Sequence, residues 1–166
     1  VMRLTTIAAA ATYLLAMSGA LVVETGSSAG CNGWPLCGGG FQLPVTAQDA
    51  INIAHRVVAG IVVLLIGAVM GAIIRRARQR AGLRVAALTV NAVIVLQIAA
   101  GAIVVDYRLP AAAQGLHVAL ASALWAMVFL VTILARRVPD TQRESVSRAA
   151  APGDTAPPVR RAEVGA

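Results

Sequence analysis

The chain contains two histidines, His55 and His117, and each lies within a long apolar stretch rather than in a polar loop. An ionisable side chain is costly to place at hydrocarbon depth, so such a residue usually marks a functional site. Neutral imidazole is also the commonest nitrogen ligand of metals in proteins. Two imidazoles that face each other from different helices at one depth could therefore hold a single metal centre.

Haem iron suits this pair best, because it needs one axial nitrogen from each side of the porphyrin plane. Zinc is less well served, since two imidazoles without a further histidine, cysteine or carboxylate leave its tetrahedral site incomplete. The alternative is a structural one, in which neutral imidazoles near the membrane interface bond to backbone or to Gln114 and Asn52. Spacing alone leaves the two interpretations open.

The residues around the histidines favour a flat, bulky ligand. Small side chains lie about one turn away along the same helix faces: Ala59, Gly60, Ala113 and Ala121. Arg56 directly follows His55, and its guanidinium could pair with a haem propionate through charge-assisted hydrogen bonds. The alternative for Arg56 is an anchor that reaches toward lipid headgroups. Gln97 is a candidate to line the same space or to tie helices together.

Four apolar stretches must position these residues. Of the 166 residues, 58% are hydrophobic and 13% charged, and the mean hydropathy is +0.78, which argues for a membrane protein. Crossing a hydrocarbon core of about 30 Å takes about 20 helical residues. We expect helices at about 4–23, 51–74, 85–105 and 111–135. The predicted fold class is all-α, an integral membrane four-helix bundle of up-down topology over residues 1–137.

All 14 basic residues are arginines, and most flank the apolar stretches. They cluster between the second and third stretches and after the fourth, so the positive-inside rule predicts cytoplasmic termini. The Arg-free loop 24–50 then faces outward from the plasma membrane, and residues 138–166 form a disordered cytoplasmic tail. This topology explains the net charge of +7 without a nucleic-acid partner. A cleaved signal peptide is the alternative for the first stretch.

Both cysteines, Cys31 and Cys37, lie in the outward loop. On an oxidising side of the membrane, with Gly33 and Pro35 available to reverse the chain, a disulfide within the loop is favoured over two free thiols. The bridge could rigidify a cap over the bundle or take part in thiol exchange. A quinone-linked thiol oxidant is a weaker alternative function, because such carriers generally use a second cysteine pair, which this sequence lacks.

The order of these motifs resembles the haem A synthase family of the CtaA type. The resemblance covers about residues 4–136 and rests on the run Glu24-Thr-Gly-Ser-Ser-Ala-Gly-Cys-Asn-Gly-Trp-Pro-Leu-Cys37, then His55-Arg56 and His117. Family members usually contain two four-helix halves, and this chain resembles one of them. The resemblance implies oxidation of a methyl group of haem O to the formyl group of haem A, for cytochrome oxidase assembly.

Several roles follow from that resemblance. It implies that His55 and His117 are the axial ligands of haem iron, with haem O as substrate or haem b as prosthetic group. It makes Cys31 and Cys37 the loop pair. The implied partners are haem O in the lipid bilayer, a second copy or another four-helix half, and a haem O synthase (farnesyltransferase).

One position departs from the family pattern. The half that receives haem O commonly carries a Glu one turn before the first histidine, and Asn52 stands there in this chain. Asn can hydrogen-bond but cannot act as a carboxylate base, so the catalytic residue is unassigned, with Asn52 and Glu24 as candidates. The main alternative function is therefore a non-catalytic haem-binding or electron-transfer subunit of the membrane.

Overall fold

The computed structural model describes residues 2–136 except 41, 78 and 109. The described part contains four long α-helices: α1 (Met2–Glu24), α2 (Ala47–Arg76), α3 (Ala81–Asp106) and α4 (Ala111–Arg136). Each of the four is long and apolar enough to cross a membrane. The all-helical membrane fold class is therefore confirmed, whereas the tail predicted for 138–166 lies outside the described residues.

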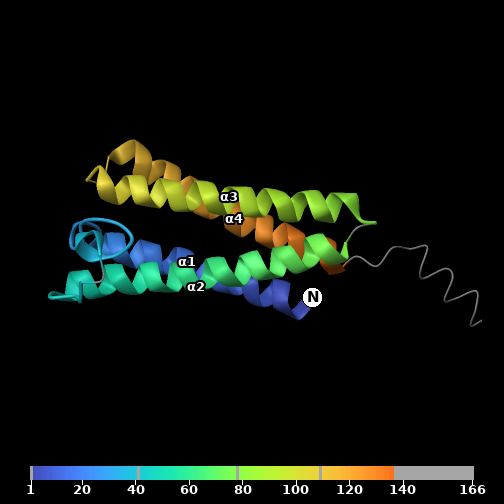
Figure 1. Ribbon diagram of the computed structural model, residues 1–166, viewed down its shortest axis with the longest axis horizontal. Coiled ribbons are helices and arrows are strands. Elements are labelled where there is room, and N and C mark those ends of the chain that lie inside the picture. The colour runs from blue at the N-terminus through green and yellow to red at the C-terminus, as the bar shows by residue number, and fades with distance from the viewer. Residues whose placement is uncertain (1, 41, 78, 109, 137–166) are drawn as a thin grey trace, which may run out of the picture. The chain divides into compact units, whose positions relative to one another are not determined.

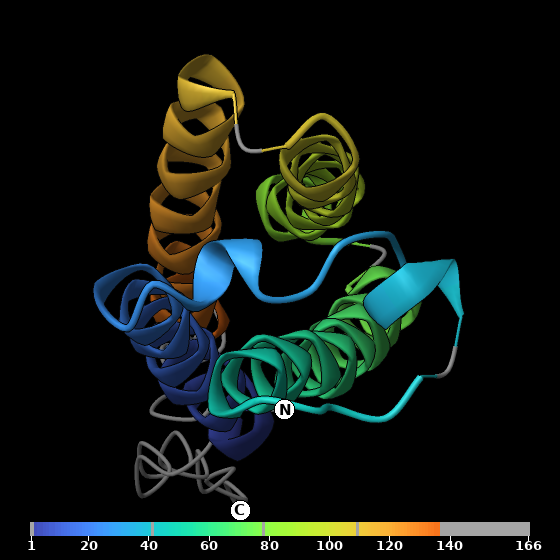
Figure 2. The ribbon, with the colours of Figure 1, turned by 90° about the vertical axis from the view of Figure 1, so that its left-hand side faces the viewer.

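The helices form a ring in which each packs against the helices before and after it, and α1 closes the ring against α4. Figure 1 places the α1–α2 and α3–α4 connections at its left end and the α2–α3 connection at its right end. In Figure 2, which faces that left end, the connection between α1 and α2 crosses over the helix ends. It contains two short 3₁₀ turns, η1 (Ser27–Ala29) and η2 (Cys37–Gly39).

The structure begins α2 four residues before the predicted start. Thr46 and Asp49 form a capping box there: the Asp49 amide donates to Thr46 Oγ1 at 3.1 Å, and the Thr46 amide donates to Asp49 Oδ2 at 3.0 Å. These bonds satisfy amide groups that have no partner inside the helix. Helix α2 can therefore begin with a polar turn ahead of the apolar stretch. The first turn of α2 therefore extends beyond the hydropathy signal.

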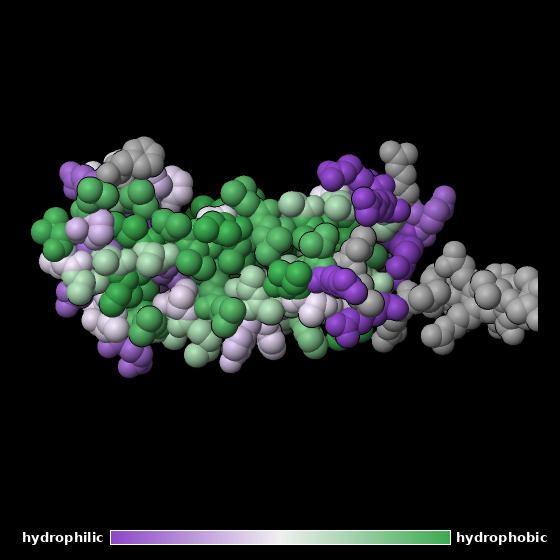
Figure 3. Space-filling view, turned by 90° about the horizontal axis from the view of Figure 1, so that it is seen from below, coloured by the Kyte–Doolittle hydropathy of each residue, from purple (hydrophilic) through white to green (hydrophobic). Residues whose placement is uncertain are grey.

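The apolar core lies toward the arginine-rich end of the bundle. Its fully buried large side chains are Ile66, Met70 and Ile73 of α2, Val90 of α3, and Val128 and Val131 of α4. Toward the other end, the described helices bury Val22, Asn52 and Ala100. Figure 3 shows the matching surface, an apolar band along the molecule with polar side chains gathered at its ends. Tight packing thus holds one half of the bundle, and the histidines lie in the other.

Candidate functional site

His55 is held from the neighbouring helix α1 by Ser18. The Ser18 hydroxyl donates its single proton to the Leu15 carbonyl at 2.7 Å, and its oxygen lies 2.8 Å from His55 Nδ1. With the hydroxyl proton on Leu15, the serine oxygen is placed to accept from His55 Nδ1–H. The neutral ring in that tautomer carries its lone pair on Nε2, where it can ligate a metal.

A glycine lets each histidine ring approach the neighbouring helix. A Cβ atom on Gly19 of α1 would lie 3.3 Å from His55 Cε1, and one on Gly101 of α3 would lie 3.0 Å from His117 Cε1. Any larger side chain at either position would press on the imidazole. The α1–α2 and α3–α4 pairs therefore use one device: a glycine on one helix makes room for a histidine on the next.

His117 differs from His55 in its hydrogen bonds. Its Nε2 lies 3.3 Å from the Gln97 amide nitrogen, which can only donate. Its Nδ1 is buried without a partner, and so is the neighbouring Gln97 Oε1. Buried polar atoms without partners are rare in folded proteins and call for an explanation such as a bound group. Here both lie at the second histidine.

The two histidines come from nearly the same depth of the bundle. His55 is the ninth residue of α2 and His117 the seventh of α4, and both helices begin at the same end, so the depths differ by about 3 Å. Both histidines are partly buried. The sequence-predicted pair therefore shares one region of the fold.

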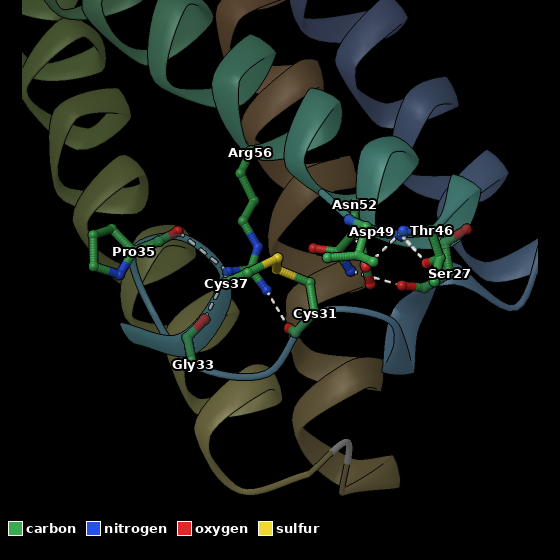
Figure 4. Close-up of a disulfide and its surroundings, with 10 residues drawn as sticks. Ser27, Cys31, Gly33, Pro35, Cys37, Thr46, Asp49, Asn52 and Arg56 are labelled. Carbon is green, nitrogen blue, oxygen red and sulfur yellow. Dashed lines mark hydrogen bonds between the residues drawn. A yellow bond between two sulfur atoms is a disulfide. The ribbon is translucent and has the colours of Figure 1, made fainter. Parts of the chain in front are cut away.

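Arg56 reaches from α2 into the cysteine loop. Its Nη1 donates to the carbonyls of Gly33 at 2.7 Å and Pro35 at 3.2 Å, and its Nη2 donates to the Cys31 carbonyl at 2.9 Å. A disulfide joins Cys31 to Cys37, as the sequence predicted, with 4.9 Å between the Cα atoms. Figure 4 shows the guanidinium beside this disulfide. Arg56 thus fixes the loop to the helix that carries His55, a role that neither sequence interpretation included.

The two catalytic candidates lie in different environments. Asn52 is 6% exposed and donates from Nδ2 to the Ser27 carbonyl at 2.8 Å, which ties η1 to α2 (Figure 4). Glu24 is the last residue of α1 and is exposed. The structure gives Asn52 a buried structural contact and gives Glu24 contact with solvent.

Sequence reasoning missed three residues of this site: Ser18, Gly19 and Gly101. Ser18 and Gly19 were noticeable only as small residues near the end of the first apolar stretch. A usable signal was the glycine one turn after Gln97, a polar residue inside an apolar helix. Gly60, which the sequence interpretation placed beside the site, is exposed, and a Cβ there would meet nothing within 4 Å.

The fold and the site define a multi-pass membrane bundle with a pair of partly buried imidazoles near one end. The family model described as "Cytochrome oxidase assembly protein" (COX15-CtaA) matches residues 40–129. The chain therefore belongs to this family, which confirms the resemblance found in the sequence.

Individual relatives agree. A heme A synthase of Symbiobacterium thermophilum is 34% identical over 117 residues, covering 70% of this chain and 38% of that protein. A heme A synthase of Geobacillus kaustophilus is 29% identical over 148 residues, covering 84% of this chain and 45% of that protein. A protoheme IX farnesyltransferase of Natronomonas pharaonis is 34% identical over 149 residues, covering 89% of this chain and 30% of that protein. The chain thus spans less than half the length of each of these relatives.

Proposed function

We propose that this chain is a four-helix unit of haem A synthase type, which binds haem O and takes part in oxidising its methyl group to the formyl group of haem A. His55 and His117 are the proposed axial ligands of the haem iron. The observation that carries this proposal is the pair of imidazoles at one depth, each packed on a glycine of the adjacent helix. The type of reaction is inferred from membership of the family.

The unsatisfied atoms at His117 support a bound group there. Haem iron would take one nitrogen lone pair from each imidazole, and His55 can offer Nε2 when Ser18 accepts its Nδ1–H. If the His117 imidazole and the Gln97 amide rearrange so that Nδ1–H donates to Gln97 Oε1, both unpartnered atoms gain a partner and His117 Nε2 is free for the metal. Haem would supply a redox-active iron and, as haem O, the methyl group.

The surroundings also fit a large apolar substrate. The helices bury few side chains in the histidine half, so a macrocycle there displaces little of the core. A prenylated haem is mostly apolar and can enter such a bundle from the lipid. The loop that carries the disulfide crosses this end of the helices, and Arg56 holds it in place. The loop would thereby restrict access of water to the site. Pairing of Arg56 with a propionate would require it to exchange loop carbonyls for a carboxylate.

A non-catalytic haem-binding or electron-transfer subunit is the second candidate, and Asn52 is the observation that favours it. Its amide is engaged with the Ser27 carbonyl and carries no carboxylate, so it cannot serve as a general base. A haem site without this acid could hold haem b as a prosthetic group and pass electrons.

The proposed setting is the plasma membrane, with an up-down bundle, cytoplasmic termini and an outward cysteine loop. The arginines between α2 and α3 and after α4 support this orientation. Because the match covers only 38% and 45% of the two heme A synthase relatives, a second copy or another four-helix half is the proposed partner. The match to a protoheme IX farnesyltransferase over 89% of this chain supports a haem O synthase as a further partner.

Pigment analysis after co-expression tests the proposal. The full chain is expressed with a haem O-producing farnesyltransferase in a host that makes no haem A, and the extracted haem is identified by mass. Haem A in the wild type, with none in His55→Ala or His117→Ala, supports the synthase. Bound haem O or haem b without haem A supports the second candidate. Absence of any bound haem in a folded preparation contradicts both.

Asn52→Glu distinguishes the two candidates further. If the chain lacks only the acid, this variant gains haem A formation while the wild type forms none. Asn52→Gln is the matched control, because it keeps the added length without a carboxylate. A wild type that forms haem A, and loses this activity on Asn52→Glu, would show that the native amide itself is needed.

A further inference from the structure

A cavity of about 340 Å³ opens between the first turns of α1 and the last turn of α4, at the end opposite the histidines. It is lined by Arg3, Thr6, Ile7 and Arg136. Arg136 donates from Nη2 to Thr6 Oγ1 at 3.1 Å, which holds its guanidinium across the seam between the two helices. Two guanidinium groups therefore border one small space beside the apolar side chain of Ile7.

An aromatic cluster lies farther along the same seam. Tyr13 of α1 contacts Trp125 of α4 with 6.0 Å between ring centroids, and Trp125 stacks on Phe129 at 5.8 Å. These rings remain 51%, 38% and 49% exposed, respectively. Exposed tyrosine and tryptophan usually lie at the membrane interface, whereas Tyr13 is the twelfth of the 23 residues of α1. The cluster therefore covers the lipid-facing seam near mid-membrane.

The cavity and the cluster form one continuous strip. Arg3, Ile7, Ala10 and Tyr13 follow one another at helical spacing on α1, as Arg136, Ile133, Phe129 and Trp125 do on α4. The ten helical steps from Arg3 to Tyr13 rise by about 15 Å. That length is about half of a hydrocarbon core, or one leaflet. The strip thus has a cationic end at the membrane surface and an aromatic end near the bilayer centre.

We propose that this seam between α1 and α4 is a binding site for one anionic phospholipid. Its phosphate lies between Arg3 and Arg136, where guanidinium N–H groups can bond to phosphate oxygens in pairs. One acyl chain extends over Ile7 and onto the aromatic cluster, which Phe129 borders on the side of the cavity. Basic pockets between transmembrane helices on the cytoplasmic side are suited to anionic headgroups. The proposal does not depend on haem, since it concerns the opposite end of the bundle.

Native mass spectrometry of the full chain, titrated with long-chain phosphatidylglycerol or phosphatidylcholine in detergent, tests the site. We expect one phosphatidylglycerol to remain bound and phosphatidylcholine to dissociate. Each arginine removed by Arg3→Gln or Arg136→Gln should weaken retention about fivefold, and the double variant about 30-fold. Arg84→Gln is the matched control, because it removes an exposed arginine outside the cavity and should leave retention unchanged.

The aromatic end has its own arm of the experiment. Phe129→Ala together with Trp125→Ala should weaken retention of long-chain phosphatidylglycerol but not of its short-chain form. Free glycerol 3-phosphate should bind far more weakly than either lipid. Tight binding of glycerol 3-phosphate would instead indicate a site for soluble phosphate compounds and overturn the lipid assignment. If Arg84→Gln and Arg3→Gln weaken phosphatidylglycerol retention equally, the binding reflects general surface charge and not a specific site.

Folding of the variants is checked by helicity. Arg136→Gln removes the bond to Thr6 and could loosen the seam, whereas Arg3→Gln removes no hydrogen bond among the described residues. Arg3→Gln therefore remains a valid test if the double variant loses helicity. Full phosphatidylglycerol retention by helical Arg3→Gln would contradict the site.

Discussion

The two halves of the bundle are built in opposite ways. The arginine-rich half contains the apolar core, with Ile66, Met70 and Val128 completely buried among four helices. The histidine half buries few helix residues and instead contains polar side chains that bond across helices, among them Ser18 and Gln97. In lipid, close packing is the main force that joins helices. One half therefore supplies the association of the helices, which leaves the other half free to hold a ligand.

The histidine half is itself asymmetric. His55 has its Nδ1 hydrogen-bonded to Ser18 and lies on the helix that Arg56 fixes to the loop. His117 has a buried ring nitrogen without a partner. Each unpaired buried polar group costs about 1–3 kcal/mol. The region around His117 is therefore destabilised unless a bound group supplies a partner. Under the proposed haem ligation, His55 would be the preorganised ligand and His117 the one completed by binding.

The largest effect is expected from shortening a side chain in the packed half. Ile66→Ala leaves a cavity among the helices and should lower the free energy of unfolding by about 3 kcal/mol, because the lost packing is not replaced by lipid. Leu64→Ala is the matched control, since Leu64 is 75% exposed on the same helix. Unfolding in detergent measures both. Equal losses would mean that the core does not stabilise the bundle.

A methyl group at Gly101 tests the histidine half. Its Cβ would lie 3.0 Å from His117 Cε1, so Gly101→Ala should displace the ring and weaken haem binding by about tenfold to a hundredfold. Gly19→Ala, with 3.3 Å to His55 Cε1, should have the smaller effect. Gly60→Ala, with nothing within 4 Å, is the control. A haem titration that ranks Gly60→Ala with Gly101→Ala would refute the packing argument.

Removing the Ser18 hydroxyl tests how the first ligand is held. Ser18→Ala leaves His55 Nδ1 without its hydrogen-bond partner and should weaken haem binding about tenfold, the lower limit for groups that orient a metal-ligating histidine. Ser18→Thr keeps the hydroxyl and should largely retain binding. The readout that separates this from general loosening is the reduction potential, which should shift with Ser18→Ala alone. Unchanged affinity and potential would show that Ser18 does not orient the ring.

The smallest effect is expected at Gln97 in the haem-free protein. Gln97→Leu removes the unpartnered Oε1 but also the amide donor of His117 Nε2, so the two changes oppose each other and the free energy of unfolding should change by less than about 1 kcal/mol. The haem-bound protein should lose stability, because the amide no longer supports His117. Thermal unfolding with and without haem measures the difference. Equal destabilisation of the haem-free and haem-bound proteins would show that Gln97 only holds neighbouring helices together.

Hydropathy was enough to predict four membrane helices, and polarity within them was enough to single out the histidines. The α2 start was wrong by one turn because a capping box, which hydropathy does not register, extends the helix to Ala47. Gly19 and Gly101 could not be assigned, since their role depends on which helix lies opposite each histidine. The Arg56 contacts were equally hidden, because they follow from the path of the loop over the bundle end.

Visible absorption of the purified, haem-loaded chain tests ligation by both histidines most directly. Wild-type protein should give a low-spin spectrum typical of two imidazole ligands, and His55→Ala and His117→Ala should each lose it while helicity is retained. Gln114→Ala, a polar change on the helix that carries His117, is the control and should keep the spectrum. A low-spin spectrum that persists at full haem occupancy in either histidine variant would contradict shared ligation.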